Sequence, residues 1–221
     1  MPRTARAVAQ GFPHHITQRG NYRQTVFSGP HDYEQYLNWL RDYSVKYSLK
    51  IWAYCLMKNH VHFIAMPVTV DSMARTLKML HMRYSQYFNA KKEMCGHLWQ
   101  GRFFSCVLDE KHLYAAVRYI ENNPVRAGVV SKAEEYRWSS AGAHVLGSKD
   151  MVLSGDCPIT DGIKNWAAYL REGEDEKDLT AIRENTKTGR PCGDEFFVIK
   201  IENMLGRQLR RSKGGRPRKK K

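Results

Sequence analysis

The chain has 221 residues, a hydrophobic share of 42% and a formal net charge of +14. This length accommodates one sizeable domain and an appendage, and the hydrophobic share is ordinary for a soluble globular protein. No apolar run approaches the roughly 20 residues that cross a bilayer, and MPRTARAVAQGFPHH lacks the apolar stretch of a secretory signal. We therefore expect a cytoplasmic protein without a membrane partner. The five cysteines form no CxxC pair, which argues against a disulfide framework and a cysteine zinc site.

The positive charge is concentrated at one end of the chain. Residues 207–221 contain nine lysines and arginines and no acidic residue, whereas residues 1–206 are only mildly basic. A charge of this sign attracts polyanions, which predicts a nucleic-acid partner and a nucleoid-associated location. A basic tail that only solubilises or targets the protein fits the same composition.

In chain order, the first half of the sequence indicates a strand, a helix and a hairpin. The segment 12–19 (FPHHITQR) lies between two glycines and can form a strand. An amphipathic helix is expected over 28–48. Residues 49–57 and 60–66 are β-rich runs separated by only two residues, which predicts a tight antiparallel hairpin.

The order continues with a helix, a strand and a further helix. Apolar residues recur at helical spacing over 71–92, and GRFFSCVL (101–108) is typical of a strand. Asp109 can cap a helix that stops at Pro124. The resulting β-α-β-β-α-β order with an added helix predicts an α+β, ferredoxin-like (RRM-like) sandwich, in which helices cover a four-stranded antiparallel sheet.

After about Gly147 the pattern weakens. A helix is expected around NWAAYL (165–170), an acidic segment follows at 171–178, and a last helix covers 194–209. We therefore divide the chain into a main domain, a mostly helical C-terminal extension and a basic DNA-binding tail. These three parts are residues 1–146, 147–206 and 207–221.

Two histidines stand one residue apart in the run MKNHVHFIAM. Because strand side chains alternate between faces, His60 and His62 share one face of the sheet, while Val61 and Phe63 point into the other layer. This spacing can provide half of a metal site. Two polar residues on a solvent-facing sheet surface produce the same pattern, so a third ligand and a reactive group are needed to distinguish the two interpretations.

The helix before Pro124 offers candidates for both groups. At about 100° per residue, Tyr119 and Asn123 lie about 40° apart beside the buried stripe of the helix and would face a shared site, whereas Tyr114 lies on the opposite flank. A boundary tyrosine with its hydroxyl in water is the alternative interpretation of Tyr119. The buried stripe consists of Leu113, Val117 and Ile120.

Several motifs in the chain resemble those of one family, in the order PHHITQRGNYRQTVF, WAYCLMKNHVHFIAMP, LWQGRFF and YIENNPVRAG. The triplet His60-Val61-His62 resembles the HUH signature, and VRYIENNPVRAG resembles the tyrosine helix of single-tyrosine HUH transposases of the insertion-sequence type. More specifically, the chain is similar to REP-associated tyrosine transposases over about residues 10–145. The segments GRPCGDEFF and GGRPRKKK also resemble the tail of many members of that branch.

The resemblance implies a role for four residues. It implies that His60 and His62 bind a divalent metal, Mg²⁺ or Mn²⁺, that Tyr119 is the nucleophile, and that Asn123 occupies the position of a third ligand. Insertion-sequence relatives tend to place a glutamine there, and the shorter Asn123 can ligate directly, through water, or not at all. Imidazole by itself suits zinc, manganese, nickel or iron better than magnesium.

The implied reaction is metal-dependent cleavage and rejoining of single-stranded DNA at palindromic hairpins such as REP elements. Free tyrosine has a pKa near 10, so Tyr119 needs help to act as a nucleophile at neutral pH. A metal on the histidines can polarise the scissile phosphate, and attack produces a 5′-phosphotyrosine and a free 3′-OH. The relatives imply either a monomer or a homodimer that exchanges the tyrosine helix.

Polar and basic residues near the predicted strand ends are candidates for DNA contacts. Tyr22, Trp99 and Phe103 can stack on bases, although Trp99 and Phe103 fit core packing better. GGRPRKKK resembles an AT-hook core that enters a minor groove, and a flexible polycation is the alternative. The candidate DNA-binding residues are Arg19, Asn21, Arg23, Lys58, Asn59, Gln100, Arg102, Arg126, Arg216 and Arg218.

Two other functions fit the same sequence. A non-catalytic nucleic-acid-binding module would keep the sheet and the basic tail, and would bind DNA regardless of metal and of Tyr119. A histidine-metal phosphodiesterase would nick DNA without a covalent intermediate. Convergence of His60, His62 and Tyr119 in the fold would favour the tyrosine mechanism over both.

Overall fold

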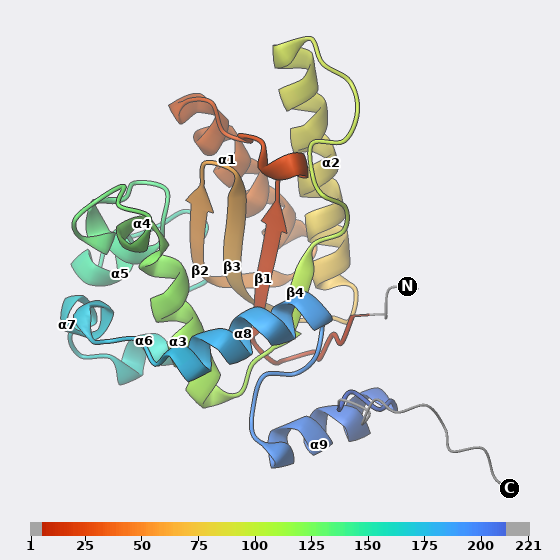
Figure 1. Ribbon diagram of the computed structural model, residues 1–221, viewed down its shortest axis with the longest axis vertical. Helices are drawn as coiled ribbons and strands as arrows, with labels where there is room; N and C mark the ends of the chain where they lie inside the picture. The colour runs from red at the N-terminus through yellow and green to blue at the C-terminus, as the bar shows by residue number, and fades with distance from the viewer. Residues whose placement is uncertain (1–5, 211–221) are drawn as a thin grey trace, which may run out of the picture.

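A four-stranded antiparallel sheet forms the centre of the computed structural model, which describes residues 6–210 (Figure 1). The strand order is β2-β3-β1-β4. The strands are β1 (His14–Arg19), β2 (Leu49–Met57), β3 (His60–Pro67) and β4 (Phe104–Val107). This order, with the first and third strands side by side in the middle, is the ferredoxin-like arrangement, and it confirms the fold class predicted from the sequence.

The predicted hairpin sets the register of the sheet. Met57 of β2 pairs with His60 of β3 across a turn of two residues. Along β3, His60 and His62 therefore point to one face, and Val61 and Phe63 point to the other. The pairing of Arg19 with His60 and of Thr17 with His62 carries the same alternation onto β1.

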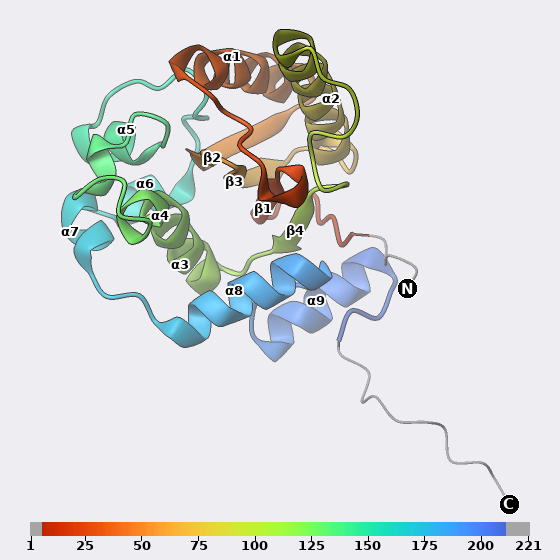
Figure 2. The same cartoon turned by 45° about the horizontal axis from the view of Figure 1, so that its top comes forward.

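Two helices, α1 (Pro30–Lys46) and α2 (Ser72–Lys92), cover one face of the sheet (Figure 2). Apolar residues of the strands, among them Ile16, Val61 and Phe63, are fully buried against this pair of helices. The cost of ordering these elements is offset by this burial, because apolar area removed from water is the main favourable contribution to folding.

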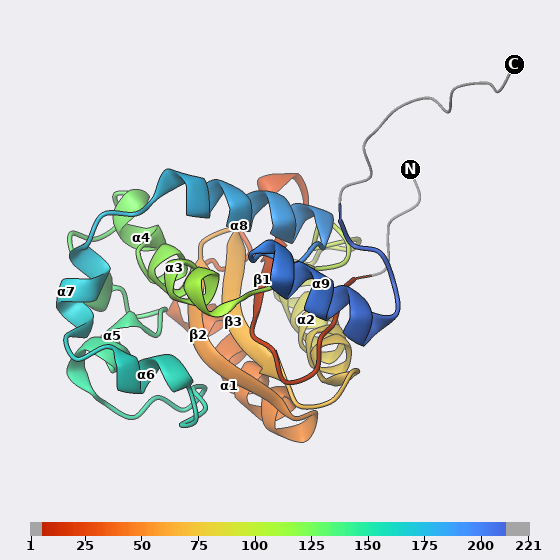
Figure 3. The same ribbon diagram turned by 90° about the horizontal axis from the view of Figure 1, so that it is seen from below.

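The opposite face is covered by α3 (Glu110–Glu121) and α8 (Glu176–Thr188), which Figure 3 shows on the far side of the strands from α1. Helix α3 begins where the side chain of Asp109 accepts a hydrogen bond from the backbone N–H of His112 at 2.8 Å, so the predicted N-cap is confirmed. Asn122 interrupts the helix, and α4 (Asn123–Arg126) follows directly.

Short elements complete the described chain. The sequence predicted α7 and α9 but not α8, because only an acidic segment was recognised there. Acidic residues favour the start of a helix, and the side chain of Asp175 caps α8 by accepting from the backbone N–H of Lys177.

No helix among residues 6–210 is long and apolar enough to cross a membrane. The remaining elements are η1 (Asn21–Arg23), η2 (Ala133–Glu135), α5 (Ala141–Leu146), α6 (Pro158–Gly162), α7 (Trp166–Arg171) and α9 (Glu195–Leu205).

The C-terminal extension shares a core with the sheet. Trp166, Leu170 and Ile182 of the extension are buried in one cluster with Val117 and Ile120 of α3. Helix α8 also contacts β4 and β1 directly. The position of α3 against the sheet therefore depends on the extension as well as on the strands.

Candidate active site

Two histidine rings of β3 lie side by side on the face of the sheet that α3 and α8 cover. The ring centroids of His60 and His62 are 5.0 Å apart, with the ring planes at 80°. His62 is 5% exposed, whereas His60, at the end of the strand, is only partly buried. Its Nδ1 lies 2.6 Å from Oδ1 of Asn59, which leaves Nε2 of His60 available.

Tyr119 lies against His62 of this pair. Its ring centroid is 5.9 Å from that of His62, in an edge-to-face arrangement. The apolar stripe of α3 holds the helix on the sheet and turns Tyr119 towards the histidines. Tyr114 lies elsewhere, against Tyr169 of α7. The predicted convergence of His60, His62 and Tyr119, with Tyr114 on another flank, is what the structure has.

His15 of β1 belongs to the same cluster, although it was not among the site residues predicted from the sequence. Its Nε2 lies 2.9 Å from Nδ1 of His62, and its Nδ1 lies 2.7 Å from Oγ1 of Thr186 on α8. When Nδ1 of His62 donates to His15, and His15 donates in turn to Thr186, Nε2 of His62 carries no proton and can bind a metal. The hydroxyl of Thr186 is 3.1 Å from Sγ of Cys106, which completes the chain. The sequence signal that could have identified His15 was its position in the first strand, one residue after His14 and on the same strand face as Thr17.

Burial keeps these histidines uncharged. It lowers the pKa of His15 to about 3 and that of His60 to about 4, the latter with a further contribution from Arg19. The pKa of His62 lies well below its usual value, mainly because of burial and also because of the neighbouring His15. Neutral imidazole is the form that binds a metal ion.

Two guanidinium groups flank Tyr119. Arg126 lies 4.3 Å from the ring centroid and Arg183 lies 5.2 Å from it. A hydrogen bond to the side chain of Tyr119 raises the pKa of Arg183 above its ordinary value, with Glu176 contributing less. Arg183 belongs to α8, which the sequence did not predict as a helix, so no sequence pattern indicated this contact.

Asn123 is held by Arg126 rather than by the histidines. Its Oδ1 accepts a hydrogen bond of 2.5 Å from Nη2 of Arg126, while its Nδ2 is buried without a partner among the described residues. Arg126 also donates to the backbone oxygen of Tyr119 and pairs with Glu174 at 2.6 Å. In this arrangement the amide oxygen, which is the ligating atom of an asparagine, is already engaged.

The donor set fits a divalent cation with an incomplete protein shell. Two adjacent neutral imidazoles suit a first-row metal such as Mn²⁺, and an amide oxygen suits Mg²⁺ or Mn²⁺. No group of three or more His, Cys, Asp and Glu residues within 6–210 is arranged to hold a metal ion. Both ring nitrogens of His15 are used in hydrogen bonds, so it does not add a third ligand.

Most of the predicted DNA-contact residues gather at one end of the sheet, beside His60. The backbone N–H of Gly20 donates to the oxygen of Asn59, and that of Gln100 donates to the oxygen of Arg19, which ties three loops together. The residues brought together are Arg19, Asn21, Arg23, Lys58, Asn59 and Gln100.

The other predicted contact residues lie apart from this group. Arg102 lines a separate pocket, and Arg126 is engaged with Glu174. Arg216 and Arg218 lie outside the described residues. Among the aromatic candidates, Trp99 and Phe103 are buried in the core as expected, whereas Tyr22 is 93% exposed and its ring is available to a base.

Comparison with known proteins gives one family and one fold. Residues 9–123 match the profile of the family described as "Transposase IS200 like". A solved REP-associated tyrosine transposase bound to a REP hairpin has a TM-score of 0.54 and 20% identity, over 71% of this chain and 93% of that one. A candidate transposase from Deinococcus radiodurans R1 has a TM-score of 0.39 and 21% identity, over 55% and 97%. Only the first similarity is close enough to compare folds, and no curated protein matches the chain.

Proposed function

The chain belongs to the IS200-like transposase family, and from this premise we propose that it is a metal-dependent endonuclease and strand transferase acting on single-stranded DNA. We propose palindromic hairpins such as REP elements as its substrates. The observation that carries the proposal is the position of Tyr119, whose ring centroid lies 5.9 Å from that of His62 and 5.2 Å from the guanidinium carbon of Arg183. The solved relative bound to a REP hairpin supports the choice of substrate through the shared fold.

His60 and His62 are the proposed metal ligands, each through Nε2. A bound Mg²⁺ or Mn²⁺ would polarise the scissile phosphate and neutralise charge on its non-bridging oxygens. The hydrogen bonds that His60 donates to Asn59 and His62 donates to His15 fix the orientation of the two rings before DNA arrives. Asn123 reaches a metal directly only if its Oδ1 leaves Arg126, so we assign it the role of an exchangeable or water-mediated ligand.

Tyr119 is the proposed nucleophile. Its hydroxyl oxygen attacks the phosphorus in line, the bond from phosphorus to the 3′ oxygen breaks, and the leaving oxygen takes up a proton as the 3′-OH. The proton of the tyrosine passes to solvent. The guanidinium of Arg183 lies over the ring of Tyr119, so its positive charge stabilises the attacking group. The tyrosyl phosphodiester is attacked in turn by the 3′-OH of another strand, which rejoins DNA and releases Tyr119.

The loop cluster at the end of the sheet is the proposed path for the strand next to the cleavage site. Arg19, Arg23 and Lys58 are exposed and supply phosphate contacts, and the exposed ring of Tyr22 supplies a stacking surface. Since these residues adjoin His60, a strand bound to them passes the histidines and Tyr119.

The test is capture of the covalent intermediate. We would incubate the full chain with hairpin oligonucleotides labelled at the 3′ end, because the fragment joined to tyrosine carries that end, and separate the products on a denaturing protein gel. A labelled band at protein mass is expected with Mn²⁺ or Mg²⁺, and it is expected to disappear with EDTA and in Tyr119→Phe. Tyr114→Phe is the matched control and keeps the band.

The alternatives give different results in the same experiment. A nicking activity that survives Tyr119→Phe but not His60→Ala would overturn the tyrosine mechanism in favour of a metal phosphodiesterase. Tight hairpin binding without any cleavage or adduct across several palindromes would indicate a binding module.

A single chain contains every proposed catalytic group, so we propose that a monomer is sufficient. His60, His62 and Tyr119 converge within one chain rather than across two. Mixing His60→Ala with Tyr119→Phe is therefore expected to restore no adduct formation. Restored activity in the mixture would show that the tyrosine helix is exchanged between two chains.

A further inference from the structure

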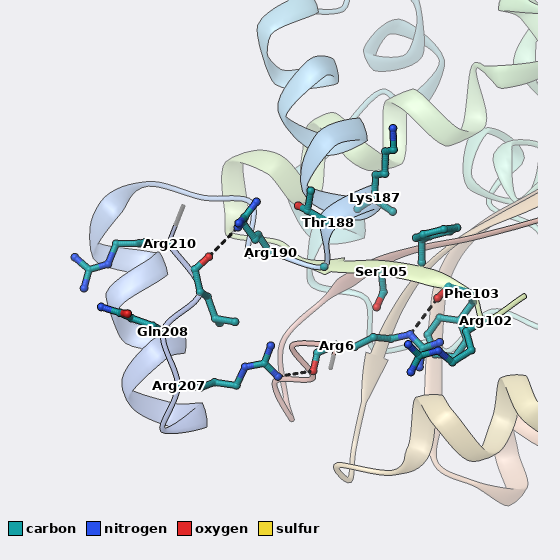
Figure 4. Close-up of a pocket in the computed structure, with 14 residues that line it drawn as sticks. Arg6, Arg102, Phe103, Ser105, Lys187, Thr188, Arg190, Arg207, Gln208 and Arg210 are labelled. Carbon is teal, nitrogen blue, oxygen red and sulfur yellow. Dashed lines mark hydrogen bonds between the residues drawn. The ribbon is translucent and has the colours of Figure 1, made fainter. Parts of the chain in front are cut away.

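A strongly basic cavity of about 380 Å³ lies at the outer edge of β4, and Tyr119 is not among the residues that line it (Figure 4). Four segments of the chain form it: the segment before β1, β4 with the loop preceding it, the end of α8 with the residues that follow it, and the residues after α9. No acidic side chain lines it among the described residues. The cationic residues of this basic edge pocket are Arg6, Arg102, Lys187, Arg190, Arg207 and Arg210.

Two cations of the pocket have no acidic partner among the described residues, whereas others are engaged. Arg210 pairs with Glu202 at 2.9 Å, and Arg190 donates through Nε to the backbone oxygen of Leu209. By contrast, the side chains of Arg102 and Lys187 make no hydrogen bond or ion pair with any residue between 6 and 210. Gathering like charges in one cavity is unfavourable unless an anion binds there, so the arrangement points to an anionic ligand.

A buried hydroxyl is the second indication of a ligand. Ser105 of β4 is 1% exposed and lines the pocket, and its Oγ has no hydrogen-bond partner within the described chain. In Figure 4 its side chain points to the side where Arg6 lies. A buried hydroxyl without a partner is unfavourable, whereas a phosphate oxygen accepts hydrogen bonds from hydroxyl and guanidinium groups together.

Thr186 connects this pocket with the candidate active site. It lines the basic edge pocket, and its Oγ1 is 2.7 Å from Nδ1 of His15, which in turn contacts His62. An anion held beside Thr186 is therefore separated from the histidine pair by the chain of contacts through His15.

We propose that the basic edge pocket binds phosphate groups of the DNA backbone next to the cleavage site, with Arg102, Lys187 and Ser105 as the groups that define it. This proposal rests on the proposed function, because it assigns a second anchoring point to the same substrate. The phosphates belong either to the duplex stem of a hairpin or to the single strand beside it. Both sources present the same phosphodiester group.

The test compares DNA affinity of variants of the full chain that carry Tyr119→Phe to prevent cleavage. Arg102→Ala with Lys187→Ala is the pocket variant. Lys78→Ala with Lys92→Ala removes the same charge from exposed positions of α2, on the other face of the sheet, and is the control. The pocket variant is expected to bind a flanked hairpin about tenfold or more weakly, and the slope of log affinity against log salt is expected to fall by about one for each phosphate that the variant no longer neutralises. Equal losses in both variants would show an effect of net charge alone and overturn the proposal.

Ser105→Ala provides a readout that does not depend on charge. Because the hydroxyl has no partner in the described chain, the melting temperature of the free protein is expected to stay the same or rise, while DNA affinity falls. Unchanged affinity for every oligonucleotide would remove Ser105 from the site.

Three different oligonucleotides identify which part of the DNA supplies the phosphate. A blunt hairpin, the same hairpin with a single-stranded flank, and the flank alone are titrated against the pocket variant. Weakening confined to oligonucleotides with the flank assigns the pocket to the single strand, and weakening with the blunt hairpin assigns it to the stem. Failure of this proposal can be told apart from failure of the proposed function. The proposed function is tested by covalent adduct formation of the unmodified chain at saturating DNA, whereas the pocket is tested by the DNA affinity of the pocket variant.

Discussion

The two faces of the sheet differ in what their buried side chains do, although the same strands supply both. On the face covered by α1 and α2, Val61 and Phe63 are fully buried and pack with aromatic side chains such as Tyr36. On the face covered by α3 and α8, His62, His15 and Thr186 form a buried hydrogen-bonded chain, and the ring of Tyr119 lies edge-to-face with that of His62. A shift of the β3 register by one residue would exchange the two sets, so the hairpin turn protects both the core and the site.

Burial of a histidine does not by itself distinguish the two faces. His81 of α2 is buried on the packed face, its Nε2 is 3.0 Å from the hydroxyl of Tyr36, and burial lowers its pKa to about 3. The pKa of His15 on the other face is lowered to about the same value for the same reason. What makes His62 a candidate ligand is the second imidazole, His60, beside it on the same strand. His81 has its Nε2 engaged by the hydroxyl of Tyr36 and has a structural role instead.

The largest expected difference between the faces is in activity. His62→Ala is expected to abolish the covalent adduct, because it removes a proposed metal ligand, while the protein remains folded. His81→Ala is expected to retain the adduct and to lower stability by about 1–3 kcal/mol, since it leaves the hydroxyl of Tyr36 without its partner. Adduct formation on a gel and thermal melting of both variants measure the two effects. An active His62→Ala variant would contradict the assignment.

The next largest effect is on stability. Phe63→Ala, on the packed face, is expected to lower the free energy of unfolding by about 3–5 kcal/mol, because it leaves a cavity in a fully buried site. His60→Ala, three residues earlier on the opposite face and partly exposed, is expected to change it by less than about 1 kcal/mol. Urea denaturation monitored by tryptophan fluorescence gives both values. Similar losses would mean that the histidine face also carries the fold.

Thr186→Val tests whether α8 orients the metal ligand from a distance. The change keeps the side-chain volume but removes the group that Nδ1 of His15 contacts, so the affinity for Mn²⁺ is expected to fall about 10- to 100-fold. Thr76→Val, at a buried threonine of the packed face, is the control and should leave Mn²⁺ affinity unchanged. Calorimetric titration of the DNA-free protein measures this directly. Identical affinities in the two variants would leave Thr186 with a packing role only.

The last expected effect concerns the start of the tyrosine helix and depends on pH. The hydrogen bond to Asp109, assisted by Cys192, raises the pKa of His112 to about 10, above its value of 6.5 when unperturbed. Because the folded chain holds this proton more tightly than the unfolded chain, the stabilisation is complete below about pH 6.5 and is lost as the pH rises towards 10. His112→Gln should therefore be less stable than wild type at pH 6 and approach it at pH 10, as melting temperatures across this range can show. A constant difference across the range would contradict this linkage.

Much of the candidate site could be predicted from local pattern. The alternation in β3 places His60 and His62 together, and helical spacing separates Tyr119 from Tyr114. The shared flank of Tyr119 and Asn123 was also predictable, yet the contact of Asn123 with Arg126 was not. That contact depends on the break at Asn122 and on Glu174, which lies 48 residues after Arg126 in the chain.

The sequence by itself determined the order of the elements up to the tyrosine helix, the face of each strand residue and the cap of that helix, because these depend on neighbours within one strand or turn. The tertiary structure alone decided which side chains meet. Thr186 contacts His15 across a separation of 171 residues. That contact, like the approach of Arg183 to Tyr119, exists because Leu179 and Ile182 are buried under α8 and hold it against β4 and α3. A helical sequence pattern predicts which face of a helix is apolar, but only the tertiary packing decides which surface of the protein that face covers.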